Sequence, residues 1–324
     1  MTISSRFARN LAAVSAACSA FLLCFSLSSF AQQLPDTIFD DPPKAFGNTL
    51  LDVPPDIHDV EIIHGEKPGD SVTVRAVIKT DPILSLYRVT EAKINFFAAG
   101  KLGCSDMTLV DEDKRLWEGE IPGMETGTKV KLGFIARDEV GNSVARLIDF
   151  SRPVKGAMLD AITDKEDQEI DASIDILSTE FASTGDRLRF CHHFRAPFRW
   201  STFGGAAAVG LGFFPDDVRF NPTHSSIENT HSFVAYFPMI DVKAILKINQ
   251  VLKGKGAGKE VSMEAKGNRV CGTVNIADLT DKPELGLKFF TGTATFNIDT
   301  EEFHLGDSSP YTILYFDALE YTAH

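Results

Sequence analysis

The ten residues 191–200, CHHFRAPFRW, are the part of this 324-residue chain whose residue types most suggest chemistry. Imidazole and thiol groups bind metals or act as nucleophiles. Aromatic rings beside guanidinium groups can hold a sugar ring or a carboxylate. The segment therefore has three interpretations: a metal site, a ligand-binding surface, or a strand that has no chemical role.

The alternation of side chains along a strand argues against a metal site in this segment. His192 and His193 are neighbours, so they point to opposite faces of a strand and cannot both bind one ion. His193 could still combine with His224 and His231 further along the chain. No metal requires that spacing, whereas zinc sites show short, defined Cys and His spacings. We therefore expect no metal ion at these histidines.

Aromatic side chains make the second half of the segment a candidate binding surface. In FRAPFRWSTFGG, Phe198, Trp200 and Phe203 lie in a turn bounded by proline and glycine rather than in an alternating strand. Exposed rings would offer flat apolar faces to a sugar, and Arg195 or Arg199 could hydrogen-bond its hydroxyl or carboxylate groups. The alternative is that these side chains cap the core of a β-sandwich.

Two cysteines lie on the polar faces of alternating segments. In DRLRFCHHF the apolar positions alternate against Cys191, and in NRVCGTVNI they alternate against Cys271. If the two strands are neighbours, these cysteines can form a disulfide, which an oxidising compartment permits. A disulfide would exclude Cys191 as a metal ligand or nucleophile. Cys104, in the glycine-flanked segment AAGKLGCSDM, remains as an incidental unpaired thiol, or alternatively as a reactive one.

Carboxylates concentrate in the segment SRPVKGAMLDAITDKEDQEID. Four of them could supply oxygen ligands for a structural calcium ion: Asp164, Glu166, Asp167 and Glu169. They lack the Asp-x-Asp-x-Asp-Gly spacing of a calcium-binding loop. We therefore interpret residues 151–170 as a solvated acidic linker or a short helix and expect no cofactor.

Catalytic motifs give little support for an enzyme. The chain has no Gly-x-Ser-x-Gly, no His-Glu-x-x-His and no phosphate-binding loop. Carboxylate pairs of a β-sandwich hydrolase would come together only in three dimensions, so that interpretation stays open. So does a haem domain, whose iron would be ligated by His192 or His193 and by Met239 or Met263.

The N-terminus predicts export. Arg6 and Arg9 precede an uncharged stretch, residues 11–30, and Ala31 ends a small-residue cleavage pattern, so residues 1–31 are a predicted signal peptide; an uncleaved anchor is the alternative. Loss of both arginines takes the formal charge from −13 to −15. Such an acidic chain is a poor partner for nucleic acid, and no later stretch is apolar enough to span a membrane.

Period-two alternation predicts an all-β fold with two β-sandwich domains. After an extended proline-rich segment, residues 32–56, four alternating segments separated by turns predict a first sandwich over residues 57–150. One of them, SVTVRAVIKT, places Val72, Val74, Ala76 and Ile78 on one face. Alternation resumes after the linker and predicts a second sandwich over residues 171–324.

Both halves carry a resemblance to known families. KPGDSVTVRAVI and LWEGEIPGMETGTKVKLGFIARDEVGN resemble bacterial immunoglobulin-like or fibronectin type III-like domains, which implies a spacer or adhesive module. IDASIDILSTEFASTGDRLRFCHHF and NRVCGTVNIADL resemble family 9-type carbohydrate-binding and DOMON-like sandwiches. That resemblance implies a larger, jelly-roll-like or Ig-like sandwich that binds sugars, calcium or haem, but no family ligand residue aligns with this chain.

These observations favour an exported, non-catalytic binding or adhesion protein of the periplasm, cell surface or exterior. The predicted ligand is a carbohydrate or cell-wall polymer bound by the second sandwich. The alternative is a structural or protein-interaction module of the cell envelope, with strand edges or loops as the contact surface. A β-sandwich hydrolase or a haem-binding domain is a third interpretation.

Overall fold

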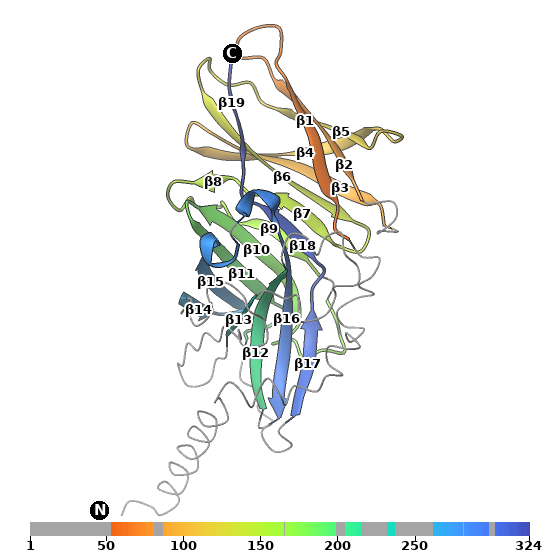
Figure 1. Ribbon diagram of the computed structural model, residues 1–324, viewed down its shortest axis with the longest axis vertical. Coiled ribbons are helices and arrows are strands. Elements are labelled where there is room, and N and C mark those ends of the chain that lie inside the picture. Colours follow the sequence, from red (N-terminus) through yellow and green to blue (C-terminus); the bar gives the residue numbers. More distant parts are fainter. Residues whose placement is uncertain are drawn as a thin grey trace, which may run out of the picture.

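The computed structural model of this chain describes residues 53–80, 87–164, 166–198, 205–214, 232–236, 262–280, 282–297 and 302–324. Its regular structure there consists of β-strands with two short 3-10 turns, so the predicted all-β sandwich class is confirmed (Figure 1). The predicted signal peptide, residues 1–31, and most of the proline-rich segment lie outside the described residues. Within those residues, no helix is long and apolar enough to cross a membrane.

The four alternating segments of the first half form strands, and further strands lie between and beside them. They are β1 (Asp56–Ile63), β2 (Val72–Lys79), β3 (Val89–Ala98), β4 (Lys101–Asp111), β5 (Leu116–Ile121), β6 (Lys129–Asp138), β7 (Ser143–Arg146) and β8 (Asp149–Phe150). In β2 the side chains alternate between buried and half-buried, as the sequence predicts for a strand with one face in a core.

The second half continues with strands of similar length. They are β9 (Leu159–Thr163), β10 (Ile176–Thr184), β11 (Arg187–Phe194), β12 (Gly205–Phe214), β13 (Ser232–Tyr236), β14 (Ser262–Lys266), β15 (Arg269–Asn275), β16 (Leu287–Asn297), β17 (Glu302–Ser308), β18 (Thr312–Tyr315) and β19 (Leu319–Thr322). The 3-10 turns η5 (Ile276–Asp278) and η6 (Pro283–Leu285) separate β15 from β16. The segment predicted as an acidic linker contributes β9.

Two sheets contain these strands. A 13-stranded sheet has the order β1-β2-β5-β4-β3-β6-β7-β18-β16-β12-β13, with β17 beside β16 and β19 beside β6. A 6-stranded sheet has the order β14-β15-β11-β10-β8, with β9 beside β10. In β4, residues 101–106 pair with β3 and residues 107–111 pair with β5, so the long sheet folds over itself at this strand.

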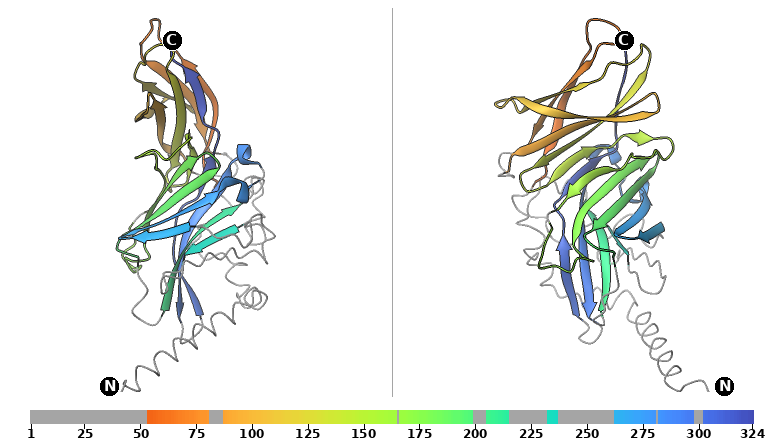
Figure 2. Two further views of the ribbon diagram at one scale, coloured as in Figure 1. Left: turned by 90° about the vertical axis from the view of Figure 1, so that its left-hand side faces the viewer. Right: turned by 180° about the vertical axis from the view of Figure 1, so that it is seen from behind.

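The C-terminal strands return to the first half of the chain. β18 pairs in parallel with β7, and β19 pairs antiparallel with β6, placing Leu319 opposite Leu132. Figures 1 and 2 show β19 among the strands of the first half. The long sheet therefore continues through both predicted sandwiches. The division into two sandwich domains, residues 57–150 and 171–324, stays a prediction.

Two hydrophobic clusters lie on opposite faces of β6. Leu132 and Phe134 belong to the cluster of the first half, whereas Ile135 belongs to the cluster of the second half. The second cluster lies between the two sheets and includes four fully buried phenylalanines: Phe181, Phe190, Phe194 and Phe289. Burying one such ring stabilises the fold by about 2–3 kcal/mol, so this cluster holds the strands that carry the candidate site.

Candidate functional site

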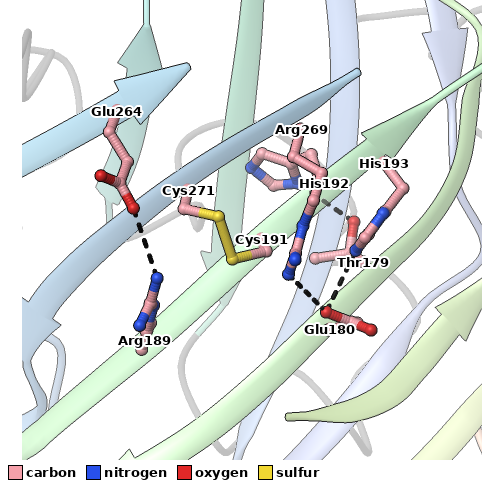
Figure 3. Close-up of a disulfide and its surroundings, with 9 residues drawn as sticks. All are labelled: Thr179, Glu180, Arg189, Cys191, His192, His193, Glu264, Arg269 and Cys271. Atoms are coloured by element: carbon pink, nitrogen blue, oxygen red, sulfur yellow. Dashed lines mark hydrogen bonds and ion pairs between the residues drawn. A yellow bond between two sulfur atoms is a disulfide. The ribbon is translucent and has the colours of Figure 1, made fainter. Parts of the chain in front are cut away.

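Strand β11 carries most of the candidate residues, and its two faces differ sharply. Phe190, His192 and Phe194 point into the core between the sheets, where each is fully buried. Their neighbours point to the outer face of the 6-stranded sheet (Figure 3). His192 and His193 therefore lie on opposite faces of the strand, which is the arrangement that strand geometry requires.

A disulfide joins Cys191 to Cys271, as the sequence predicts. The two residues are direct partners in the antiparallel pairing of β11 with β15, and their Cα atoms are 4.0 Å apart. The bond connects positions 80 residues apart in the sequence. Because its sulfur is engaged in this bond, Cys191 is neither a metal ligand nor a nucleophile.

Ion pairs surround the disulfide on the outer face of the sheet. The Glu180 carboxylate lies 3.0 Å from Nε2 of His193 and 2.9 Å from Nη2 of Arg269. On the other side, Nη2 of Arg189 lies 3.3 Å from Oε1 of Glu264 (Figure 3). Both cysteines are buried although they face outward.

A buried polar contact connects the two sheets behind β11. The Nδ1 atom of His192 lies 3.0 Å from Oγ1 of Thr179, which in turn lies 3.0 Å from Oγ1 of Thr291 on β16. Burial lowers the pKa of His192 to about 3, with a smaller contribution from the neighbouring His193, so the ring is neutral at physiological pH. Its Nε2 atom has no hydrogen-bond partner in the part of the chain that the structure describes.

Arg195 follows directly after β11 and holds the acidic segment. Its Nε atom lies 2.6 Å from Oδ2 of Asp175, whose side chain is fully buried. Its Nη2 atom donates to the main-chain oxygens of Asp167 at 2.8 Å and Ile170 at 2.6 Å, and its Nη1 atom lies 3.3 Å from Oε1 of Glu166. The guanidinium thus organises residues 166–175 through charge and directional hydrogen bonds.

The chain remains tightly held up to Phe198. The main-chain N–H of Ala196 donates to the oxygen of Ala172 at 2.8 Å. Phe198 is only 9% exposed, and its ring centroid lies 4.8 Å from that of Phe194. The structure thus joins Arg195 to the acidic segment and packs Phe198 on Phe194. Their role as ligand-binding residues stays a prediction.

The other predicted site residues lie outside the described residues. These are Arg199, Trp200 and Phe203 of the aromatic turn, His224 and His231 of the metal candidates, and Met239 of the haem interpretation. Within the described residues, no group of three or more His, Cys, Asp or Glu side chains could hold a metal ion. In the acidic segment, Oε1 of Glu166 accepts a hydrogen bond from Gln168, and Oδ1 of Asp167 accepts one from the main chain of Glu169.

A shallow cleft of about 270 Å³ lies between β3, β4 and residues 156–159. Cys104, an unpaired and exposed cysteine, forms part of its wall, and Asn95 lies beside it. Partial desolvation raises the pKa of the Cys104 thiol, and the opposing charge of Lys93 has a smaller effect. Because the thiolate is the reactive form, this thiol is a slow nucleophile at neutral pH.

The sequence did not reveal that Arg195 binds the acidic segment, although both features were visible separately. The sequence shows an arginine at a strand end and a carboxylate cluster about 20–30 residues earlier, which have complementary charges. It does not show which residues of the two segments lie opposite each other. The pairing of β10 with β11 supplies that register, because it places Ile176 opposite Phe194 and so brings residue 175 close to residue 195.

Comparisons with known proteins add no family. No family model matches the sequence, and no curated protein matches it. Among solved structures, the chain is similar to one described as "Crystal structure of Br derivative BhCBM56". The identity is 16%, the match covers 28% of this chain and 90% of that chain, and the TM-score is 0.20. The strands of the structure establish an all-β protein.

Proposed function

We propose that this protein is an exported, non-catalytic binding protein. Its ligand is a carbohydrate or cell-wall polymer, held at the end of β11 by the aromatic turn that begins at Phe198. The observation that carries the proposal is the fixed geometry at this point of the chain. Arg195 and Phe198 hold the last turn before Trp200 against the body of the sandwich.

Anchoring at this point favours binding for a thermodynamic reason. When a ligand stacks on a mobile side chain, that side chain becomes ordered. The ordering weakens binding by about 0.5–1.5 kcal/mol for each side chain immobilised. Here the polypeptide leading to the turn is already ordered by the buried ring of Phe198 and the hydrogen bond from Ala196. The main chain up to Phe198 therefore needs no further ordering when a ligand binds.

Polar groups near the same corner suit a sugar ligand. Glu166, Asp167, Gln168 and Glu169 are exposed on the segment that Arg195 holds. Carboxylate and amide groups accept hydrogen bonds from sugar hydroxyls, while aromatic faces cover the apolar side of the ring. The combination supports a carbohydrate more than an apolar ligand.

Export is supported by the disulfide. Stable disulfides persist in oxidising compartments and are rare in the cytosol. Cys191 and Cys271 form such a bond between strands that are already neighbours in the sheet. Together with the predicted signal peptide, this supports a location in the periplasm, on the cell surface or outside the cell.

A second candidate function is a protein-interaction module of the cell envelope. Strand β14 stands at the end of the 6-stranded sheet and pairs only with β15 among the described strands. The open edge of such a strand presents main-chain N–H and C=O groups to which a partner strand can add. The same holds for β1 at the end of the long sheet.

A depletion assay tests the carbohydrate proposal. Purified protein is incubated with insoluble polysaccharides and with peptidoglycan, the polymer is sedimented, and the protein left in the supernatant is measured. We expect depletion by at least one polymer and its loss in Trp200→Ala, because the substitution removes the large aromatic face on which the apolar side of a sugar ring would pack. The melting temperature of Trp200→Ala should stay within a few degrees of the wild-type value.

Matched controls separate a local site from general adsorption. Arg189→Ala removes an exposed charge on the outer face of β11, and that variant should bind as the wild type does. Binding that persists in Trp200→Ala would place the ligand elsewhere. If none of the polymers depletes the protein, the carbohydrate proposal is contradicted and a protein partner at a strand edge is favoured.

A further inference from the structure

Two histidines from opposite ends of the described chain meet at one end of the molecule. His64 follows β1, and His324 follows β19. Their ring centroids are 4.3 Å apart with an interplanar angle of 65°. Tyr321 packs on the same imidazole, with its ring centroid 5.4 Å from that of His64. In Figure 1 the C-terminus lies at the same end of the molecule as the turn between β1 and β2.

Regular structure holds both histidines in place. β1 ends with Ile63 paired to Thr73 of β2, directly before His64. On the other side, the main-chain N–H of Ala323 donates to the oxygen of Thr128 at 2.9 Å, and the oxygen of Ala323 accepts from Gly127 at 2.8 Å. The main chain beside each imidazole is therefore fixed by strand pairing or by hydrogen bonds.

The pair bridges two layers of the first half of the molecule. β1 pairs with β2 at one end of the folded-over sheet, whereas β19 pairs with β6 beyond the bend in β4. No described pairing joins β1 to β19 directly. A group that bound both imidazoles would connect the two layers at their open edge.

The spacing of the rings fits two ligands of one metal ion. The rings meet in an edge contact. If one nitrogen of each ring turns toward a common ion at about 2.1 Å, that ion lies about 3.2 Å from each ring centroid. Centroids 4.3 Å apart then subtend an angle of about 85° at the metal. Angles near 90° belong to the square-planar and octahedral sites of Ni(II) and Cu(II), whereas tetrahedral zinc prefers wider angles.

The tyrosine that packs on His64 carries a polar group without a partner. The hydroxyl of Tyr321 is buried and has no hydrogen-bond partner among the described residues. A buried hydroxyl without a partner costs about 1–3 kcal/mol, so an unpaired one marks a position where a further polar group is favourable. No third His, Cys, Asp or Glu joins the pair within the described residues. Water would therefore complete the coordination.

We propose that His64 and His324 form a two-histidine binding site for a divalent transition-metal ion of the Ni(II) and Cu(II) type. The ion fastens the C-terminal strand β19 to the end of β1 and closes the open edge of the first half of the molecule. This site is distinct from the aromatic turn and does not depend on the carbohydrate proposal.

Calorimetric titration of the untagged protein with NiCl₂ tests this site. Ni(II) is preferred as the probe because it does not oxidise the free thiol of Cys104. We expect one ion per chain. Both His64→Asn and His324→Asn should weaken binding by at least about tenfold, because even loss of a residue that hydrogen-bonds to a metal ligand lowers metal affinity about 10–100-fold. The melting temperature of the wild type should rise with Ni(II), because an ion that binds only the folded state stabilises it.

His58→Asn is the matched control, because His58 lies on β1, the strand that His64 follows, and contacts Asp56. It should bind Ni(II) as the wild type does. The melting temperatures of the metal-free variants should equal that of the wild type, which would show that neither imidazole is needed for folding. Wild-type protein that binds no Ni(II), or binding that survives in both single variants, would overturn the proposal.

Discussion

Substitution of Arg195 by methionine tests whether this side chain is a structural anchor. The change removes the guanidinium and keeps much of the apolar stem. It leaves the Asp175 carboxylate, which is fully buried, without the cation 2.6 Å away. Removing one partner of a buried ion pair costs about 3–5 kcal/mol, because a charge then remains in a medium of low dielectric constant. We therefore expect Arg195→Met to lower the free energy of unfolding by about that amount.

Urea denaturation of a double-mutant cycle measures the effect. Asp175→Asn removes the buried charge, so the double variant should recover part of the stability lost in Arg195→Met. A coupling energy of about 2 kcal/mol or more would assign the loss to the pair. Arg195→Lys should recover only part of the wild-type stability, because a single ammonium cannot reproduce the planar set of donors that reaches Asp167 and Ile170.

The matched control is Arg189→Met on the same strand. Arg189 forms an exposed pair with Glu264, and exposed pairs contribute about 0–1 kcal/mol. If Arg195→Met were no more destabilising than Arg189→Met, the anchoring role would be refuted, and with it the argument that the aromatic turn starts from a fixed point.

Three further predictions concern groups outside that pair. Replacing Cys191 and Cys271 together by serine should lower the free energy of unfolding by up to about 4.5 kcal/mol, the value that the chain-entropy model gives for an 80-residue separation. For a unit of roughly 270 residues, that loss corresponds to a fall in melting temperature of about 8 °C. Reduction with dithiothreitol in mild urea should reproduce the shift. The pKa of His192 is lowered to about 3 in the fold, whereas it is near 6.5 in the unfolded chain. The contribution of the neutral ring to stability is therefore fully present above about pH 6.5. It is lost as the pH falls toward 3, by about 1.4 kcal/mol per pH unit. Urea midpoints measured across that range should show a smaller slope in His192→Gln. Cys104 should react with iodoacetamide more slowly than a model thiol at pH 8, because desolvation raises its pKa, and denaturation should remove the difference.

Alternation in the sequence predicted which side chains share a face. It placed Val72, Val74, Ala76 and Ile78 together, and all four are buried in one core. It also placed Cys191 and Cys271 on the polar faces of their strands, where the structure joins them. These predictions succeed because strand geometry fixes the direction of each side chain locally, without reference to the rest of the chain.

Pairing between distant strands could not be predicted in the same way. The alternation of β19 would fit the exposed edge of either sheet, yet Leu319 lies opposite Leu132 in the first half of the chain. The choice depends on which edge is open once the other strands have formed, and no local pattern encodes that. The meeting of His64 with His324 follows from this pairing and is equally invisible in the sequence.

The outer face of β11 shows why residue types alone misdirect a search for chemistry. Cys191, His193 and Arg195 are neighbours on one face in the sequence, and a cysteine, a histidine and an arginine together suggest catalysis. In the fold each has a separate structural partner: Cys191 bonds to Cys271, His193 contacts Glu180, and Arg195 pairs with Asp175. All three partners come from strands or turns beside β11, so these side chains fasten that strand to its surroundings. A firmly held strand end is what a binding turn needs, and the stability of the Arg195 anchor is therefore the quantity on which the proposed ligand site depends.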